Sequence, residues 1–129
     1  KSEDTPPAAL AANARPIVDL GRLAETSPVV GPVWTHQSDD LNVNLLVFGA
    51  GDGVAEHVNT EVDVLVIGIH GQGQIELNGR THSLAAGQAL VIPKGARRAT
   101  RAESARFAYL TCHRRRAGLW PTVRPQSAS

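Results

Sequence analysis

An Asn-Gly pair between two alternating segments is the feature of this sequence that most restricts its fold. Asn78-Gly79 lies between QIEL and RTHSL. Both residues tolerate the positive φ angles that a two-residue type I′ hairpin loop requires. Other short strand-like segments precede and follow this pair, and they are separated by turns rich in Gly, Pro and Asn. The pattern predicts an all-β domain built from short antiparallel strands.

Eight segments are predicted to be strands because they alternate apolar and polar residues or form short apolar runs between turns. They are residues 42–48, 55–59, 63–70, 73–77, 80–84, 89–92, 97–102 and 106–114. Pro93 ends the sixth because it cannot donate a ladder hydrogen bond. Glycines and prolines interrupt residues 16–34, which predicts short strands and turns there, and His36 is expected in a loop.

Length and composition are those of one small globular domain. The chain has 129 residues, of which 42% are hydrophobic and 19% charged, enough apolar material for one core. We expect a flexible N-terminal arm over residues 1–14, a barrel over 15–116 and a flexible C-terminal tail over 117–129. The longest apolar run is far shorter than the ~20 residues that cross a bilayer, so no membrane partner is expected.

Charge is distributed unevenly along the chain, although the net charge is only +1. Residues 1–79 carry three basic and eleven acidic side chains, and residues 80–129 carry ten basic and one acidic. The basic half, which ends in Arg114-Arg115-Arg116, has neither interleaved aromatics nor a recognition helix, so no nucleic-acid partner is expected. The single cysteine, Cys112, forms no internal disulfide, which favours a cytoplasmic location.

Two spaced motifs within residues 42–113 resemble those of the cupin superfamily. The first cupin motif is Gly, five residues, His-x-His, three or four residues, Glu, six residues, Gly; at that spacing this chain has Gly51, His57-Val58-Asn59, Val64 and Gly71. The second is Gly, five residues, Pro-x-Gly, two residues, His, three residues, Asn; here this chain has Gly87, Pro93-Lys94-Gly95, Arg98 and Ala102. The resemblance implies a single-domain cupin β-barrel of the jelly-roll type.

The resemblance also implies where a metal would bind, and this chain departs from that pattern. In cupins the two histidines of the first motif, its glutamate and the histidine of the second converge on one metal ion. His57 keeps its position, whereas Asn59, Val64 and Arg98 replace the other three ligands. The permanent charge of Arg98 repels a divalent cation. We therefore expect no metal and no other cofactor, with an ordinary four-ligand metal site as the alternative.

Two acidic residues compete with Val64 for the carboxylate position. A three-residue gap in the first motif would place Asp63 there, and Glu61 is a third candidate in a turn. Val64 is preferred because the four-residue gap before it and the six-residue gap between it and Gly71 then both match the motif. An Arg98 inside the barrel needs a partner. That partner is either the carboxylate of Asp63 or Glu61, or the carboxylate, phosphate or enolate of a ligand held by two hydrogen bonds.

Period-two alternation selects the residues that face the barrel interior. After His57 and Asn59 the inward set continues through Val64, Val66 and Gly68, where the glycine either leaves room for a ligand or marks a bulge. In the last strand five residues share one face: Phe107, Tyr109, Thr111, His113 and Arg115. They either line a ligand cavity, or the two aromatics belong to the core and His113 and Arg115 lie in solvent at the strand end.

These positions define the candidate site. The candidate ligand-binding residues are Asn59, Val66, Arg98, Tyr109, Thr111 and His113, and His57 is the candidate catalytic residue. The leading hypothesis is a cupin that binds a small polar or anionic metabolite without a metal. His57 would serve as general acid or base if the protein is also an isomerase, cyclase or lyase.

Two alternatives stay open. One is a metal-dependent cupin enzyme, a dioxygenase or isomerase with an atypical site. The other is a non-catalytic cupin that senses a ligand or supports an oligomer. Cupins that this chain resembles commonly pair, so a homodimer is expected, with contacts near the N-terminal strands.

Overall fold

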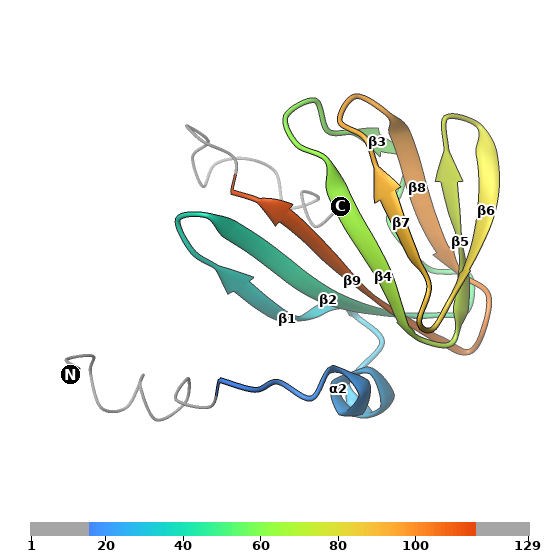
Figure 1. The fold of residues 1–129 in the computed structure, drawn as a ribbon. Coiled ribbons are helices and arrows are strands. Elements are labelled where there is room, and N and C mark those ends of the chain that lie inside the picture. The colour runs from blue at the N-terminus through green and yellow to red at the C-terminus, as the bar shows by residue number, and fades with distance from the viewer. Residues whose placement is uncertain (1–15, 116–129) are drawn as a thin grey trace, which may run out of the picture.

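The computed structural model describes residues 16–115, and these form one short helix and nine strands (Figure 1). The helix is α2 (Leu20–Thr26), and the strands are β1 (Gly31–Gln37), β2 (Leu41–Gly49), β3 (His57–Val58), β4 (Val64–His70), β5 (Gln72–Leu77), β6 (Arg80–Ala85), β7 (Ala89–Ile92), β8 (Arg97–Ala102) and β9 (Arg106–Arg114). The predicted N-terminal arm and C-terminal tail lie outside the described residues. Within residues 16–115 no helix has the length and apolar character needed to span a membrane.

Two antiparallel sheets face each other (Figure 1). One has the strand order β1-β2-β9-β4-β7 and the other has the order β3-β8-β5-β6. The apolar core between them contains Leu46, Val62, Val64, Val66, Ile75, Leu84, Ile92, Ala96, Ala102, Phe107 and Tyr109. This arrangement confirms the all-β barrel of jelly-roll type.

The turns that the sequence predicted have the expected backbone. Asn78 and Gly79 have φ angles of 50° and 85°, and they join β5 to β6 with Leu77 opposite Arg80, as in a two-residue hairpin. The four glycines of the two motifs also adopt positive φ. They are Gly51, Gly71, Gly87 and Gly95. These positions therefore carry the architecture that the resemblance implied.

The N-terminal part of the fold corrects the sequence interpretation. Residues 20–26 form a helix rather than a strand or turn. Asp19 caps this helix, since its Oδ1 accepts a hydrogen bond from the Arg22 backbone N–H at 3.0 Å. Ala24 of the helix packs on the outer face of the five-stranded sheet, and the apolar cluster there comprises Ala24, Leu45, Val47 and Ala108, with Leu20 and Leu23 against it.

Two strand boundaries also differ from those predicted. His36, expected in a loop, belongs to β1 and pairs with Val43 of β2. The strand predicted over residues 55–59 is reduced to His57–Val58. The other predicted strands are present, each within one or two residues of its predicted ends.

Candidate ligand site

One end of the barrel interior is polar, and along β9 the inward-facing residues change there from aromatic to polar. The inward-facing residues of β9 are Phe107, Tyr109, Thr111 and His113, none of them more than 4% exposed. Phe107 and Tyr109 belong to the core, with ring centroids 5.2 Å apart. Thr111 and His113 continue the same face as buried polar residues. The shared face is confirmed, and the alternative in which His113 lies in solvent is wrong.

A hydrogen bond across the barrel aligns β9 with β8. Thr100 Oγ1 and Tyr109 Oη are 2.8 Å apart, and both residues are buried. Arg98 lies two residues from Thr100 on the same face of β8, and Thr111 lies two residues from Tyr109 on the inward face of β9. Arg98 is only 1% exposed. Its guanidinium therefore lies inside the barrel, on the side that the motif spacing indicated.

His57 is the hydrogen-bond acceptor for Arg98. The two residues are register partners between β3 and β8, and Arg98 Nε donates to His57 Nε2 at 3.0 Å. The other ring nitrogen, Nδ1, lies 2.9 Å from the Ala55 carbonyl oxygen. Because Nε2 accepts, His57 is neutral and donates from Nδ1. Action as a general base would require the bond to Arg98 to break first.

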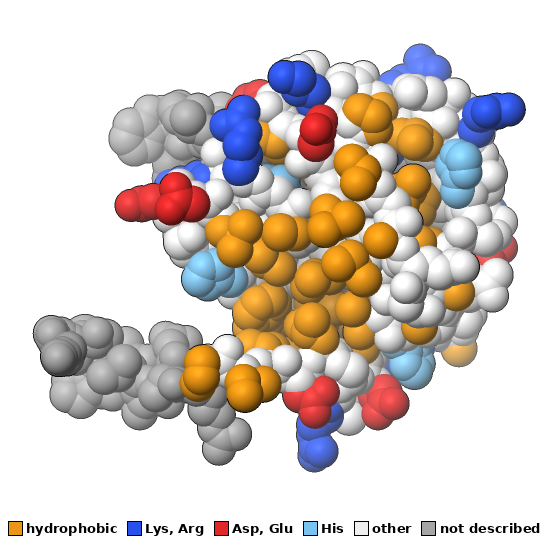
Figure 2. Space-filling model, in the orientation of Figure 1, with side chains coloured by type: hydrophobic (Ala, Val, Ile, Leu, Met, Phe, Trp, Pro, Cys, Tyr) orange, Lys and Arg blue, Asp and Glu red, His pale blue; other side chains and the backbone are white. Residues whose placement is uncertain are grey.

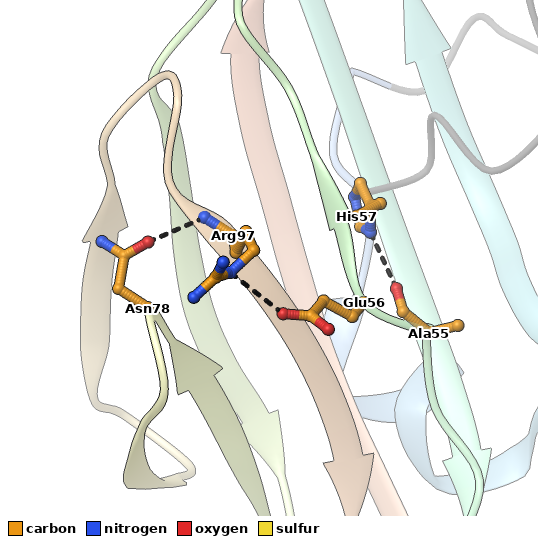
Figure 3. Close-up of polar contacts among 5 residues, drawn as sticks. All are labelled: Ala55, Glu56, His57, Asn78 and Arg97. Atoms are coloured by element: carbon orange, nitrogen blue, oxygen red, sulfur yellow. Dashed lines mark hydrogen bonds and ion pairs between the residues drawn. The ribbon is translucent and has the colours of Figure 1, made fainter.

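Arg97 and Arg98 point to opposite sides of β8. Arg97 Nε forms an ion pair with Glu56 Oε2 at 3.2 Å, and the Asn78 side chain accepts a hydrogen bond from the Arg97 backbone N–H. Figure 3 shows Arg97 and Glu56 directed toward each other while the His57 ring points away from them. The Arg97 side chain is 61% exposed. Arg97, on the outer side of β8, is therefore the matched control for substitutions of Arg98.

Asn59 follows β3 and closes the polar end. It is 7% exposed, and its Oδ1 accepts hydrogen bonds from the backbone N–H groups of Glu61 and Val62, at 2.9 and 3.3 Å. His113 is 4% exposed, and its Nδ1 lies 2.9 Å from the Arg114 carbonyl oxygen. Asn59 and His113 are therefore both buried, and hydrogen bonds to the backbone fix the orientation of their side chains.

The carboxylates proposed as competitors for the inward position lie elsewhere. Asp63 Oδ1 accepts a hydrogen bond from the Lys94 backbone N–H at 2.8 Å, at an exposed turn. Val64 is fully buried in the core. The four-residue gap in the first motif is therefore the one that the fold adopts. Within residues 16–115, Glu61 is exposed, and the side chain that accepts from Arg98 Nε is the neutral His57.

Val66 and Gly68 complete the inward row of β4. Val66 is fully buried and forms an apolar wall next to Thr111, its register partner on β9. A side chain at Gly68 would overlap the Ala85 carbonyl oxygen, and the register of β4 on β9 shifts between Gly68 and His70. Of the two roles considered for Gly68, the structure supports close backbone approach beside a bulge rather than space for a ligand.

The residues at the ligand positions of the cupin motif do not fit a metal ion. The Nε2 lone pair of His57, which would bind the metal, accepts the Arg98 hydrogen bond. The remaining positions hold an amide, a valine and the guanidinium, and an arginine beside a divalent cation is repulsive. In the part of the chain that the structure describes, no three His, Cys, Asp or Glu side chains cluster closely enough to hold a metal.

Three further residues face this interior, and sequence reasoning missed them. Thr100 lies two residues from Arg98, so extending the alternation along β8 would have found it. Asn42 and Asn44 are the β2 partners of His113 and Thr111, on the same face of the sheet. Their place depends on the register of β2 against β9, which no local pattern gives.

Burial raises the pKa of the Tyr109 hydroxyl above its ordinary value of 10.0, against smaller lowering effects from the Thr100 hydrogen bond and the Arg98 charge. Because the raised pKa belongs to the folded state, its stabilising effect is complete below pH 10 and is lost as the pH rises further. We expect the free energy of unfolding to fall by about 1.4 kcal/mol per pH unit there.

Tyr109→Phe should remove this fall, which alkaline denaturation curves of the two proteins will measure. Tyr109 is the one tyrosine of the sequence, so tyrosinate absorbance reports it directly and should rise together with unfolding. Ionisation at the ordinary pKa in a protein that stays folded would contradict the buried hydroxyl.

The fold and the motif positions together define the class of protein. Two facing antiparallel sheets, positive-φ glycines at the motif positions and an inward His57–Arg98 pair form a cupin-type barrel with an arginine at one ligand position.

Comparison with known proteins gives the same fold. No protein-family model and no curated protein matches the chain. A Thermus thermophilus protein of known structure is 27% identical, with 76% of this chain and 95% of that one covered and a TM-score of 0.67. A cupin-2 domain protein from Shewanella frigidimarina is 19% identical over 77% of this chain and 95% of that one, at a TM-score of 0.64.

A third similar structure is an uncharacterized conserved protein with a double-stranded beta-helix domain from Klebsiella pneumoniae. It is 16% identical, with 81% of this chain and 94% of that one covered and a TM-score of 0.68. These likenesses show that the chain has the cupin fold.

Proposed function

We propose that this protein binds a small organic anion at the polar end of its barrel, without a metal ion, and that Arg98 is the anchor. The observation that carries the proposal is a permanently charged guanidinium that is 1% exposed and donates to a neutral histidine. Arginine suits carboxylate and phosphate groups because its planar fork can hold two of their oxygens at once.

The surroundings of Arg98 support this function. Asn59 and Thr111 are further buried polar residues, and Val66 of the apolar core is the register partner of Thr111. A few fixed polar groups among apolar side chains are typical of small-molecule sites. Cytoplasmic location stays a prediction, and so does catalysis through His57.

Calorimetric titration tests the proposal with butyrate, 2-hydroxybutyrate and 2-oxobutyrate as probes. The protein is purified without chelator, and the metal content of the same sample is measured by mass spectrometry. We expect at least one acid to bind while metal is well below one ion per chain, and excess chelator should leave the affinity unchanged. Binding that appears only after metal is added would favour the metal-dependent alternative.

We also propose that the protein forms a homodimer through the outer face of the five-stranded sheet. Four strands place an apolar row there, in which Val43, Cys112, Leu65 and Val91 are successive register partners. Leu65 is 36% exposed and Val91 56% exposed. Figure 2 shows hydrophobic side chains gathered on this face. A contiguous exposed apolar surface of this kind typically marks an interface.

The outer face of the other sheet has the opposite character. Its outward residues include Gln74, Glu76, Thr81, Arg97 and Arg101. Antiparallel sheets that face water are polar on that side. The contrast between the two outer faces therefore favours a partner on the five-stranded sheet, and a second copy would match its uncharged rows without bringing like charges together.

Val91→Glu should separate the two copies because it places a charge within the apolar row. We expect light scattering to give the mass of two chains for the unchanged protein and of one chain for Val91→Glu at the same concentration. Thr81→Glu, on the outer face of the other sheet, is the control and should stay dimeric. An unchanged protein with the mass of one chain across the concentration range would exclude this dimer.

A further inference from the structure

Two polar atoms at the polar end have no hydrogen-bond partner among the described residues. They are Asn59 Nδ2 and Thr111 Oγ1. Asn59 is 7% exposed and Thr111 is fully buried. Buried polar groups in native proteins nearly always have a partner, so each such atom calls for an explanation. Asn59 lies two residues after His57, the register partner of Arg98, and Thr111 lies two residues after Tyr109 on the inward face of β9.

The neighbours of Thr111 are already engaged elsewhere. Across the sheet Thr111 is flanked by Val66 of β4 and Asn44 of β2. Valine offers no polar atom. Both polar atoms of the Asn44 side chain bond to other residues. Its Oδ1 accepts from Thr35 Oγ1 at 2.6 Å, and its Nδ2 donates to Asn42 Oδ1 at 3.4 Å. Within residues 16–115 the strand neighbours of Thr111 therefore give its hydroxyl no partner.

The orientation of the Asn59 amide is fixed by its oxygen. Oδ1 accepts from the backbone N–H groups of Glu61 and Val62, and this assigns which end of the amide is oxygen. Nδ2 must then point away from that turn. An amide nitrogen only donates, so the group that meets it must carry a hydrogen-bond acceptor.

We infer that the ligand is a short-chain acid with a second oxygen, a hydroxyl or a carbonyl, besides its carboxylate. This inference rests on the proposed function, in which Arg98 holds the carboxylate. Thr111 Oγ1 and Asn59 Nδ2 then receive the second oxygen. Arg98 and Asn59 donate and Thr111 can donate, so the site as a whole selects an acceptor-rich molecule. Val66, the buried register partner of Thr111, offers the carbon chain an apolar contact.

A matched set of probes tests the second oxygen separately from the carboxylate. Butyrate, 2-hydroxybutyrate and 2-oxobutyrate share one carbon chain, and their affinities are measured by calorimetry. Sites built to hydrogen-bond a substrate oxygen discriminate strongly against analogues that lack it. We expect the unchanged protein to bind at least one oxygenated acid about tenfold or more tightly than butyrate.

Thr111→Val removes the hydroxyl and keeps the shape of the side chain. We expect it to reduce the preference for the oxygenated acid over butyrate to about twofold or less. Thr81→Val, on the exposed outer face of β6, is the control and should keep the full preference. The melting temperature of ligand-free Thr111→Val should equal or exceed that of the unchanged protein, because a buried hydroxyl without a partner is replaced by a methyl group.

The outcomes separate this inference from the proposed function. If all three acids bind equally and Arg98→Leu abolishes all binding, the anion site is supported and the inference that the ligand carries a second oxygen is wrong. If none of the acids binds, both fail. A Thr111→Val protein that keeps the full preference, or that melts at a lower temperature, overturns the role of Thr111.

Discussion

Arg98→Leu is expected to abolish the binding of small organic acids, and Arg97→Leu is expected to leave it unchanged. The two arginines are adjacent in β8, but Arg98 is buried beside His57 whereas the Arg97 side chain is 61% exposed and pairs with Glu56. Removing one partner of a buried charge pair costs about 2–5 kcal/mol of binding free energy. The affinity should therefore fall by about 30-fold or more, measured by calorimetry with the same acids.

The stability of Arg98→Leu distinguishes a lost ligand contact from a lost fold. Removing Arg98 takes the donor away from His57 Nε2, which costs about 1–3 kcal/mol of stability. We expect the ligand-free variant to keep a single cooperative unfolding transition in denaturant, at a lower midpoint than the unchanged protein. Unaltered affinity in a folded Arg98→Leu protein would show that Arg98 is not the anchor.

Gly71→Ala is expected to destabilise the fold strongly. Gly71 joins β4 to β5 with a φ of +71°, and a Cβ there would overlap the Arg106 carbonyl oxygen and meet Ser104 Oγ. The left-handed backbone alone costs a non-glycine residue about 1 kcal/mol. The clash with backbone, which cannot move aside, should raise the total loss to about 3 kcal/mol or more.

Gly79→Ala is the matched control for this substitution. Gly79 also has a positive φ, of +85°, but a Cβ there would have nothing within 4 Å. Chemical denaturation should therefore give a loss of only about 1 kcal/mol for Gly79→Ala. Equal losses for the two variants would mean that the Gly71 backbone can relax away from Arg106.

Local patterns were enough to predict most of the barrel. The Asn78-Gly79 loop, the motif glycines and the period-two strands need only neighbouring residues, and each is found in the fold. Helix α2 was missed because Gly21 was taken as a turn signal, although Asp19 three residues before Arg22 is a helix N-cap pattern. Short strands were predicted within residues 16–34, but the extent of β1 to Gln37 was not, because His36 was expected in a loop.

The candidate site was predictable only in part. Motif spacing placed Arg98 inside, and alternation placed Thr111 and His113 on one face of β9. The partner of Arg98 was not predictable, because the bond to His57 depends on the pairing of β3 with β8, forty-one residues apart in the chain. Gly68 was ambiguous for the same reason: its close neighbour, Ala85, comes from another part of the sequence.

The metal and the anion make opposite demands on this end of the barrel. A metal ion needs the Nε2 lone pair of His57 and repels Arg98, whereas an anion needs Arg98 and leaves the His57 hydrogen bond in place. Metal binding and anion binding therefore exclude each other at His57 Nε2, so a single crystal structure can distinguish them.

The most direct measurement is a crystal structure of the protein grown with one of these acids and a divalent transition metal, with anomalous diffraction recorded at the metal absorption edge. We predict density for a carboxylate within hydrogen-bond distance of the Arg98 guanidinium and no anomalous peak at His57 Nε2. A metal peak bound to His57 Nε2, with Arg98 turned away from it, would contradict the account.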